Sequence, residues 1–113
     1  MSESLTPIEI DCLSVKQKLD AKEPFKFIDC REFDEYERVK IEGAELVPMS
    51  ELAELVGELE PFKNSPLIIH CHHGGRSLRV ARWLRNQGFV HAQSMAGGID
   101  KWAQEIDTSL PRY

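Results

Sequence analysis

The chain has 113 residues, and its shares of hydrophobic (42%) and charged (29%) residues are ordinary for a soluble globular protein. A chain of this length can bury one sizeable core, so we expect a single domain over residues 1–113. The 19 Asp and Glu outnumber the 14 Lys and Arg, for a formal charge of −5, which counts against nucleic acid as a partner because phosphate binding needs clustered positive charge.

From the sequence we expect neither a membrane span nor a secretory signal. No apolar run approaches the roughly 20 residues of a membrane span. The opening segment MSESLTPIEID lacks the basic and apolar regions of a secretory signal. We therefore expect a cytoplasmic protein with no membrane partner.

Alternating apolar strands and helical patterns run through the whole chain. Strands are expected at 6–11, 25–30, 45–48, 67–69 and 89–95. Helices are expected after a cap at Ser14, through Tyr36, over 50–59, from about Ser77 to 87 and around Trp102. Strands that alternate with helices indicate an α/β fold, with a mostly parallel sheet and helices on both faces.

Charge is distributed unevenly along the chain. Residues 1–60 hold 7 basic and 16 acidic side chains, whereas residues 61–99 hold five basic and no acidic ones, together with all four histidines. This invites the hypothesis of an anion site in the acid-free stretch. For the arginines that step by three along its helix, a solvated face is the better interpretation; they are Arg79, Arg82 and Arg85.

The three cysteines are Cys12, Cys30 and Cys71. They are odd in number, far apart and without the paired spacing of a zinc site. In a cytosolic setting this favours reduced thiols over a disulfide framework. One thiol can be reactive while the others are small core residues, because free Cys is commonly buried.

Cys71 is the reactive candidate. It follows the apolar run 67–69 and precedes Gly74, Gly75 and Arg76, so it lies at the carboxyl end of a strand, where open α/β sheets bind ligands. Inward-turned backbone N–H groups, the helix N-terminus and the Arg76 cation are expected to lower the pKa of Cys71 and favour the nucleophilic thiolate. The alternative is a buried cysteine before a glycine turn.

The loop length separates two chemistries. Four residues lie between Cys71 and Arg76, whereas cysteine phosphatases use a C-x5-R loop, and the position that would complete that pattern is Ser77. A narrower ring of amides fits one extra sulfur atom better than a phosphoryl group. The spacing therefore favours sulfur transfer.

Several motifs in order resemble the single-domain rhodanese (thiosulfate sulfurtransferase) family, over nearly the whole chain. Residues 28–32 (IDCRE) are similar to its D-x-R-E segment, residues 71–77 (CHHGGRS) match its C-x-x-G-x-R-S active-site loop, and residues 97–102 (GGIDKW) match its closing G-G-[IV]-x-x-W motif. The resemblance implies a rhodanese-like, five-stranded mostly parallel sheet and a double-displacement reaction.

In that reaction Cys71 would take sulfane sulfur from thiosulfate or another donor as a persulfide. It would pass the sulfur to cyanide, a protein thiol or a sulfur-carrier protein, with no cofactor or metal. The resemblance assigns the loop residues to substrate binding and three others to its support. The loop set is His72, His73, Gly74, Gly75, Arg76 and Ser77, and the supporting set is Asp29, Arg31 and Trp102.

The chain departs from the family at His72, where Arg or Lys is common. A neutral imidazole gives a weaker positive field, which counts against turnover of dianionic thiosulfate while leaving persulfide chemistry in place. The competing hypotheses are a non-catalytic binding module with the same fold and, less favoured, a phosphatase or arsenate reductase. Trp102 is equally well interpreted as a core aromatic residue.

Two further interpretations concern cysteine and histidine. Cys30 alternates with Asp29, so we expect it to face a helix, and neither Cys30 nor Cys12 is expected to act as a resolving thiol. The cluster of residues 70–73 (HCHH) could suggest a metal site, but neighbouring strand residues point to opposite sides and no second ligand group lies at helical spacing. We therefore predict no metal.

Overall fold

Five parallel strands form the centre of the computed structural model, which describes residues 6–113. The first five residues, on which part of the prediction of no secretory signal falls, lie outside the described residues. The strand order is β1-β5-β4-β2-β3, with every neighbouring pair parallel. The strands are β1 (Glu9–Ile10), β2 (Lys26–Asp29), β3 (Glu45–Leu46), β4 (Leu67–His70) and β5 (Ala92–Met95). The predicted α/β fold with five strands is confirmed.

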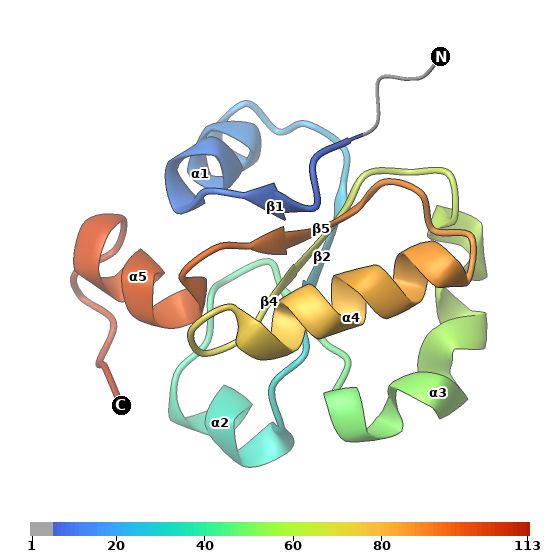
Figure 1. Cartoon of the computed structure of the whole chain (residues 1–113). Helices are drawn as coiled ribbons and strands as arrows, with labels where there is room; N and C mark the ends of the chain where they lie inside the picture. Colours follow the sequence, from blue (N-terminus) through green and yellow to red (C-terminus); the bar gives the residue numbers. More distant parts are fainter. Residues whose placement is uncertain (1–5) are drawn as a thin grey trace.

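Helices cover both faces of this sheet (Figure 1). They are α1 (Cys12–Asp20), α2 (Phe33–Arg38), α3 (Leu52–Leu55), α4 (Gly75–Asn86) and α5 (Gly98–Glu105). One core, which we call the α3–α4 core, contains Ile69 and Leu84, and the other, the α1–α5 core, contains Ile68 and Val15. Because neighbouring residues of β4 feed opposite cores, all four of its residues are buried. No helix within residues 6–113 is long and apolar enough to cross a membrane.

Three predicted boundaries are corrected. Helix α1 is capped by Asp11 rather than Ser14. The backbone of Asp11 is extended, and its carboxylate accepts the Ser14 N–H at 2.7 Å. The segment predicted as one helix over 50–59 is a single α-helical turn between 3₁₀ turns, Met49–Glu51 and Val56–Phe62. The last strand begins at Ala92, since the Phe89 N–H still bonds the Leu84 carbonyl at the end of α4.

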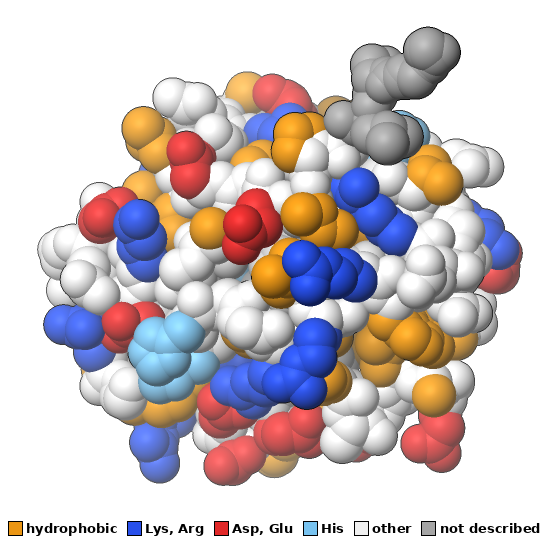
Figure 2. Space-filling view, viewed as in Figure 1, with side chains coloured by type: hydrophobic (Ala, Val, Ile, Leu, Met, Phe, Trp, Pro, Cys, Tyr) orange, Lys and Arg blue, Asp and Glu red, His pale blue; other side chains and the backbone are white. Residues whose placement is uncertain are grey.

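Basic side chains gather over the surface that α4 occupies, and histidines gather beside the end at which that helix begins (Figure 2). Arg79 and Arg82 are exposed there, as predicted. Arg85 is not a solvated side chain: its guanidinium donates to the carbonyls of Ala92 (2.8 Å) and Thr6 (2.7 Å). It therefore ties α4 to β5 and to the start of the described chain.

The start of α5 fixes the loop after β4. The N–H of Ile99 bonds the Cys71 carbonyl at 2.8 Å, and the N–H of Asp100 bonds the His72 carbonyl at 3.0 Å. Gly98 has φ +61, and a Cβ at this position would overlap both carbonyl oxygens. The second glycine of the 97–102 motif is therefore required by a close backbone approach.

Replacing Gly98 with Ala is expected to destabilise the protein by roughly 2–4 kcal/mol, from the positive φ and the overlap with two carbonyl oxygens. Urea unfolding of the two proteins measures the difference. Gly57→Ala is the matched control, because no atom lies within 4 Å of the added Cβ there, and its effect should stay within about 1 kcal/mol. Equal stability losses for the two variants would contradict the proposed contact.

Candidate active site

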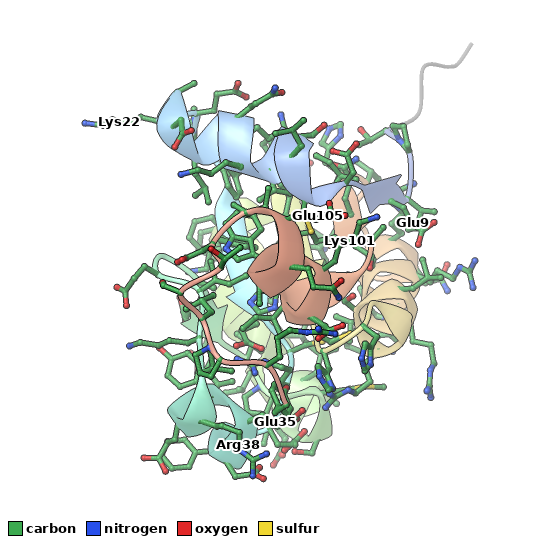
Figure 3. The ribbon with its side chains drawn as sticks, turned by 90° about the vertical axis from the view of Figure 1, so that its left-hand side faces the viewer. Glu9, Lys22, Glu35, Arg38, Lys101 and Glu105 are labelled. Carbon is green, nitrogen blue, oxygen red and sulfur yellow. The ribbon has the colours of Figure 1, made fainter. Side chains whose placement is uncertain are left out.

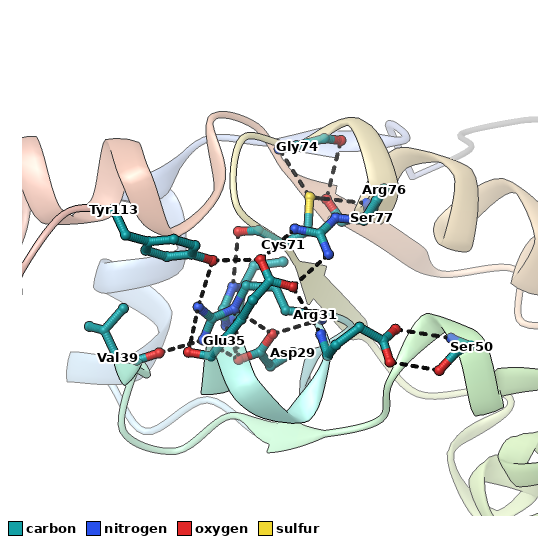
Figure 4. Close-up of polar contacts among 12 residues, drawn as sticks. Asp29, Arg31, Glu35, Val39, Ser50, Cys71, Gly74, Arg76, Ser77 and Tyr113 are labelled. Atoms are coloured by element: carbon teal, nitrogen blue, oxygen red, sulfur yellow. Dashed lines mark hydrogen bonds and ion pairs between the residues drawn. The ribbon is translucent and has the colours of Figure 1, made fainter. Parts of the chain in front are cut away.

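Cys71 directly follows β4, and its side chain is almost closed off, at 1% exposure. Its sulfur accepts the backbone N–H groups of Gly74 at 3.1 Å and Ser77 at 3.3 Å, and the Ser77 hydroxyl lies 3.4 Å away (Figure 4). Gly74 has φ +109, and this left-handed turn lets α4 begin at Gly75, two residues earlier than predicted. The short turn thus aims two amides at one sulfur atom.

The same surroundings lower the pKa of Cys71 to about 4. The largest cause is a hydrogen bond from the Cys30 thiol, followed by those from the Ser77 hydroxyl and the amides of Ser77 and Gly74, while burial acts in the opposite direction. Cys71 is therefore a thiolate at neutral pH, as the sequence predicts. The predicted backbone amides contribute, but the largest cause, the Cys30 thiol, was not predicted, and the Arg76 cation is not among the main causes.

Arg76 instead binds a carboxylate. Its guanidinium donates two hydrogen bonds to Glu35 of α2, at 2.7 and 2.8 Å. The pKa of Glu35 falls to about 2, chiefly because of this pairing. Arg76 therefore joins the beginning of α4 to α2 and holds the loop in place.

Asp29 and Arg31 form a fully buried ion pair at the end of β2. The Arg31 guanidinium donates to the Asp29 carboxylate at 2.9 and 2.7 Å, and to the Val39 carbonyl at 2.6 Å. It also donates to the Tyr113 hydroxyl at 2.9 Å, and that hydroxyl in turn donates to Glu35 at 2.8 Å. One buried cation thus joins the end of β2 to Val39 and Tyr113, and a supporting role for the pair in the reaction stays a prediction.

The last segment of the chain runs from α5 towards α2, where Glu35 and Arg38 are labelled in Figure 3. Tyr113 at its end stacks on the His72 ring, with ring centroids 3.9 Å apart and an angle of 3° between the planes. The His73 side chain is 67% exposed beside it. The two loop histidines therefore lie in different settings, one beneath an aromatic ring and the other towards solvent.

The remaining predicted site residues are Gly75 and Trp102. Gly75 is the exposed first residue of α4. Trp102 is buried within the α1–α5 core beside Ile99, in agreement with its interpretation as a core aromatic residue. A role for Trp102 at the site stays a prediction.

Sequence reasoning missed several contributors. Cys30 faces the α3–α4 core as expected, but Cys71 lies on the same face, so the two thiols meet. Ser94 of β5 shares a 2.7 Å hydrogen bond with the Ser77 hydroxyl. Tyr113 carries no motif that would indicate its contact with the site. For Cys30 the signal was available, because two strands that end at the same edge bring their next residues together.

One group within residues 6–113 has the composition of a metal site. Ligand atoms of His72, His73 and Asp100 lie within 4.8 Å of one another. Asp100 already accepts from Arg112 at 2.9 Å and from Gln104 at 2.9 Å, so a cation would have to compete with existing partners. Sequence reasoning missed Asp100, which only the folding of α5 against the loop brings to the histidines.

Arg31→Met is expected to destabilise the protein by roughly 3–5 kcal/mol, because it leaves the buried Asp29 carboxylate without its cation. Thermal and urea unfolding measure the change. The matched control is Lys16→Met, which breaks an exposed pair with Asp20 and should cost no more than about 1 kcal/mol. A small effect at Arg31 would argue against its organising role.

The ultraviolet absorbance of the Cys71 thiolate should titrate near pH 4, because folded surroundings favour the charged form. Ser77→Ala removes one donor and should move this midpoint to higher pH, while Cys71→Ser abolishes the signal. Burial raises the pKa of Cys12 to about 11, so its titration is well separated. A Cys71 midpoint near the ordinary value of about 8.5 would contradict the arrangement.

Comparison with known proteins agrees with this geometry. A family model for the rhodanese-like domain matches residues 12–105. The chain is 35% identical over 99 residues to the putative sulfur carrier protein YrkF of Bacillus subtilis, covering 88% of this chain and 52% of YrkF. It is 33% identical over 92 residues to the thiosulfate sulfurtransferase GlpE of Coxiella burnetii, covering 81% of this chain and 84% of GlpE.

The crystal structure of SSP1007 from Staphylococcus saprophyticus superimposes with a TM-score of 0.76 at 30% identity, over 94% of this chain and 100% of that one. The chain spans about half of YrkF and 23–30% of three plant proteins that it also matches. With the family model covering most of its length, the chain belongs to the rhodanese-like family and has the rhodanese fold.

Proposed function

We propose that this chain is a sulfurtransferase that carries sulfane sulfur as a persulfide on Cys71. The observation that carries the proposal is the Cys71 thiolate, held by the amides of Gly74 and Ser77 in a nearly closed site. Such a sulfur is ionised and therefore nucleophilic at neutral pH. The proposal treats the chain as a single rhodanese-like domain.

The reaction takes place in two displacements at sulfur. In the first, the Cys71 thiolate attacks the outer sulfur of the donor, a sulfur–sulfur bond forms, and the bond to the rest of the donor breaks, which releases sulfite if the donor is thiosulfate. In the second, a thiolate or cyanide attacks that outer sulfur and the Cys71 thiolate leaves. The N–H groups that hold the thiolate stabilise it both as nucleophile and as leaving group.

We infer the chemical class of the sulfur donor and acceptor from the charge of the active-site loop and from the activities named for two relatives. YrkF is named a putative sulfur carrier protein and GlpE a thiosulfate sulfurtransferase. His72 stands at the loop position that is commonly basic in the family, and Arg76 is already paired with Glu35. This weak positive field favours a persulfide donor over the thiosulfate dianion, with a small thiol or a thiol-bearing or sulfur-carrier protein as acceptor.

Two observations weigh against the alternatives. A phosphatase would need the loop arginine to bind phosphate oxygens, whereas the Arg76 guanidinium is paired through both terminal nitrogens with the Glu35 carboxylate, which neutralises its charge. A non-catalytic binding module has no need for a cysteine with its pKa lowered to about 4. Sulfur transfer uses both features.

Incubation with a sulfane donor, such as thiosulfate or a glutathione persulfide, is expected to add the mass of one sulfur atom to the wild type. Intact-mass measurement on Cys71→Ser should show no addition, while Cys12→Ser, which changes a thiol in the opposite core, should react like the wild type. An unmodified wild type with every donor would overturn the proposal, and steady hydrolysis of an aryl phosphate that depends on Cys71 would favour a phosphatase.

A further inference from the structure

Cys30 and Cys71 are neighbours across two paired strands. Asp29 of β2 is in register with His70 of β4, and the Cys30 N–H bonds the His70 carbonyl at 3.0 Å. Each cysteine comes one residue after these partners. Adjacent parallel strands lie about 4.8 Å apart, which is within the Cα separations of about 4.4–6.8 Å that disulfides span.

Both side chains point to the same side of the sheet. Cys30 and Cys71 both belong to the α3–α4 core, and each is 1% exposed. The third thiol, Cys12, lies in the α1–α5 core, where its nearest polar partners are the carbonyls of Ala96 and Gly98. Cys30 is therefore the thiol placed to react with Cys71.

Contrary to the expectation from the sequence, we propose that Cys30 is a resolving thiol, which attacks the Cys71 persulfide, closes a Cys30–Cys71 disulfide and releases the carried sulfur as hydrosulfide. The inference rests on the proposed persulfide function and adds a second outcome for the same intermediate. When an acceptor is present the sulfur is transferred, and when none arrives it leaves as sulfide.

The step balances without any outside oxidant. The Cys30 sulfur bonds to Sγ of Cys71 while the bond between Sγ and the outer sulfur breaks. The outer sulfur takes both electrons of that bond and the Cys30 proton, and leaves as HS⁻. Two cysteine thiols are oxidised to a disulfide and one sulfane sulfur is reduced to sulfide.

The surroundings make Cys30 the slower reactant. In the unmodified protein the Cys71 sulfur and burial raise the pKa of Cys30 well above its ordinary range, and burial still disfavours the Cys30 thiolate once Cys71 carries a sulfur. Because the thiolate is the attacking form, an external acceptor that reaches the persulfide reacts before Cys30 does. The disulfide then blocks Cys71 until a thiol reductant reopens it, so the pair limits how long an unclaimed persulfide persists.

The test follows intact mass and sulfide release after one addition of a glutathione persulfide, with the excess donor removed. In the wild type we expect the added sulfur to disappear, sulfide to appear in equal amount, and peptide mapping to find a Cys30–Cys71 disulfide. In Cys30→Ser and Cys30→Ala the persulfide should persist, with sulfide release falling to the level of Cys71→Ser. Cys12→Ser is the matched control and should release sulfide like the wild type.

Treatment of the reduced wild type with diamide separates this inference from the proposed function, because it needs no persulfide. Formation of the Cys30–Cys71 disulfide, reversed by dithiothreitol, supports the pairing even if no donor modifies Cys71, whereas the sulfide-releasing step would then fall with the proposed function. A stable wild-type persulfide without disulfide, together with no Cys30–Cys71 disulfide after diamide, would overturn the inference and leave the sulfurtransferase proposal intact.

Discussion

The rest of this structure depends on one constraint: the Cys71 sulfur is negatively charged and almost completely buried. Burial disfavours the Cys71 thiolate, so the protein must supply hydrogen-bond donors where water cannot. They come from the turn at Gly74, the first turn of α4 at Ser77 and the end of β2 at Cys30. Each depends on a different piece of tertiary structure, and together they set the state of one atom.

The charged residues of the site pair with one another and with backbone carbonyls, and not with that sulfur. Arg31 joins the end of β2 to the segment before β3 and to the last residue of the chain, while Glu35 joins α2 to Arg76. Their charges are neutralised among themselves, so the field at Cys71 comes mainly from neutral dipoles. This arrangement suits the single negative charge of the proposed persulfide better than a multiply charged phosphate.

One hydrogen bond between two thiols has opposite effects on its partners. It lowers the pKa of Cys71, because a donated hydrogen bond stabilises the thiolate. It raises the pKa of Cys30, because the Cys30 thiol would lose this hydrogen bond on ionising. The same contact therefore favours the nucleophilic thiolate at Cys71 and the protonated thiol at Cys30. In the proposed chemistry this difference sets the order of events, with transfer to an acceptor ahead of disulfide closure.

Much of the fold was predictable from local patterns. The alternation of apolar runs and helical stripes indicated the parallel α/β sheet, and the fully apolar run at 67–69 indicated one of its strands, which the structure buries along its whole length. Boundaries were less predictable, as at Asp11 and Phe89, because caps and turn hydrogen bonds decide them at the level of single residues.

By itself the sequence determined that Cys71 stands at a strand–loop–helix junction with a four-residue interval before Arg76, and hence that it is the reactive thiol candidate. The tertiary structure alone decided what surrounds it: that Arg76 turns to Glu35, that Tyr113 covers His72, and that Cys30 meets the sulfur. The reason is physical. Backbone turns and spacing are local properties of the chain, whereas the partner of a side chain depends on which distant segments pack beside it.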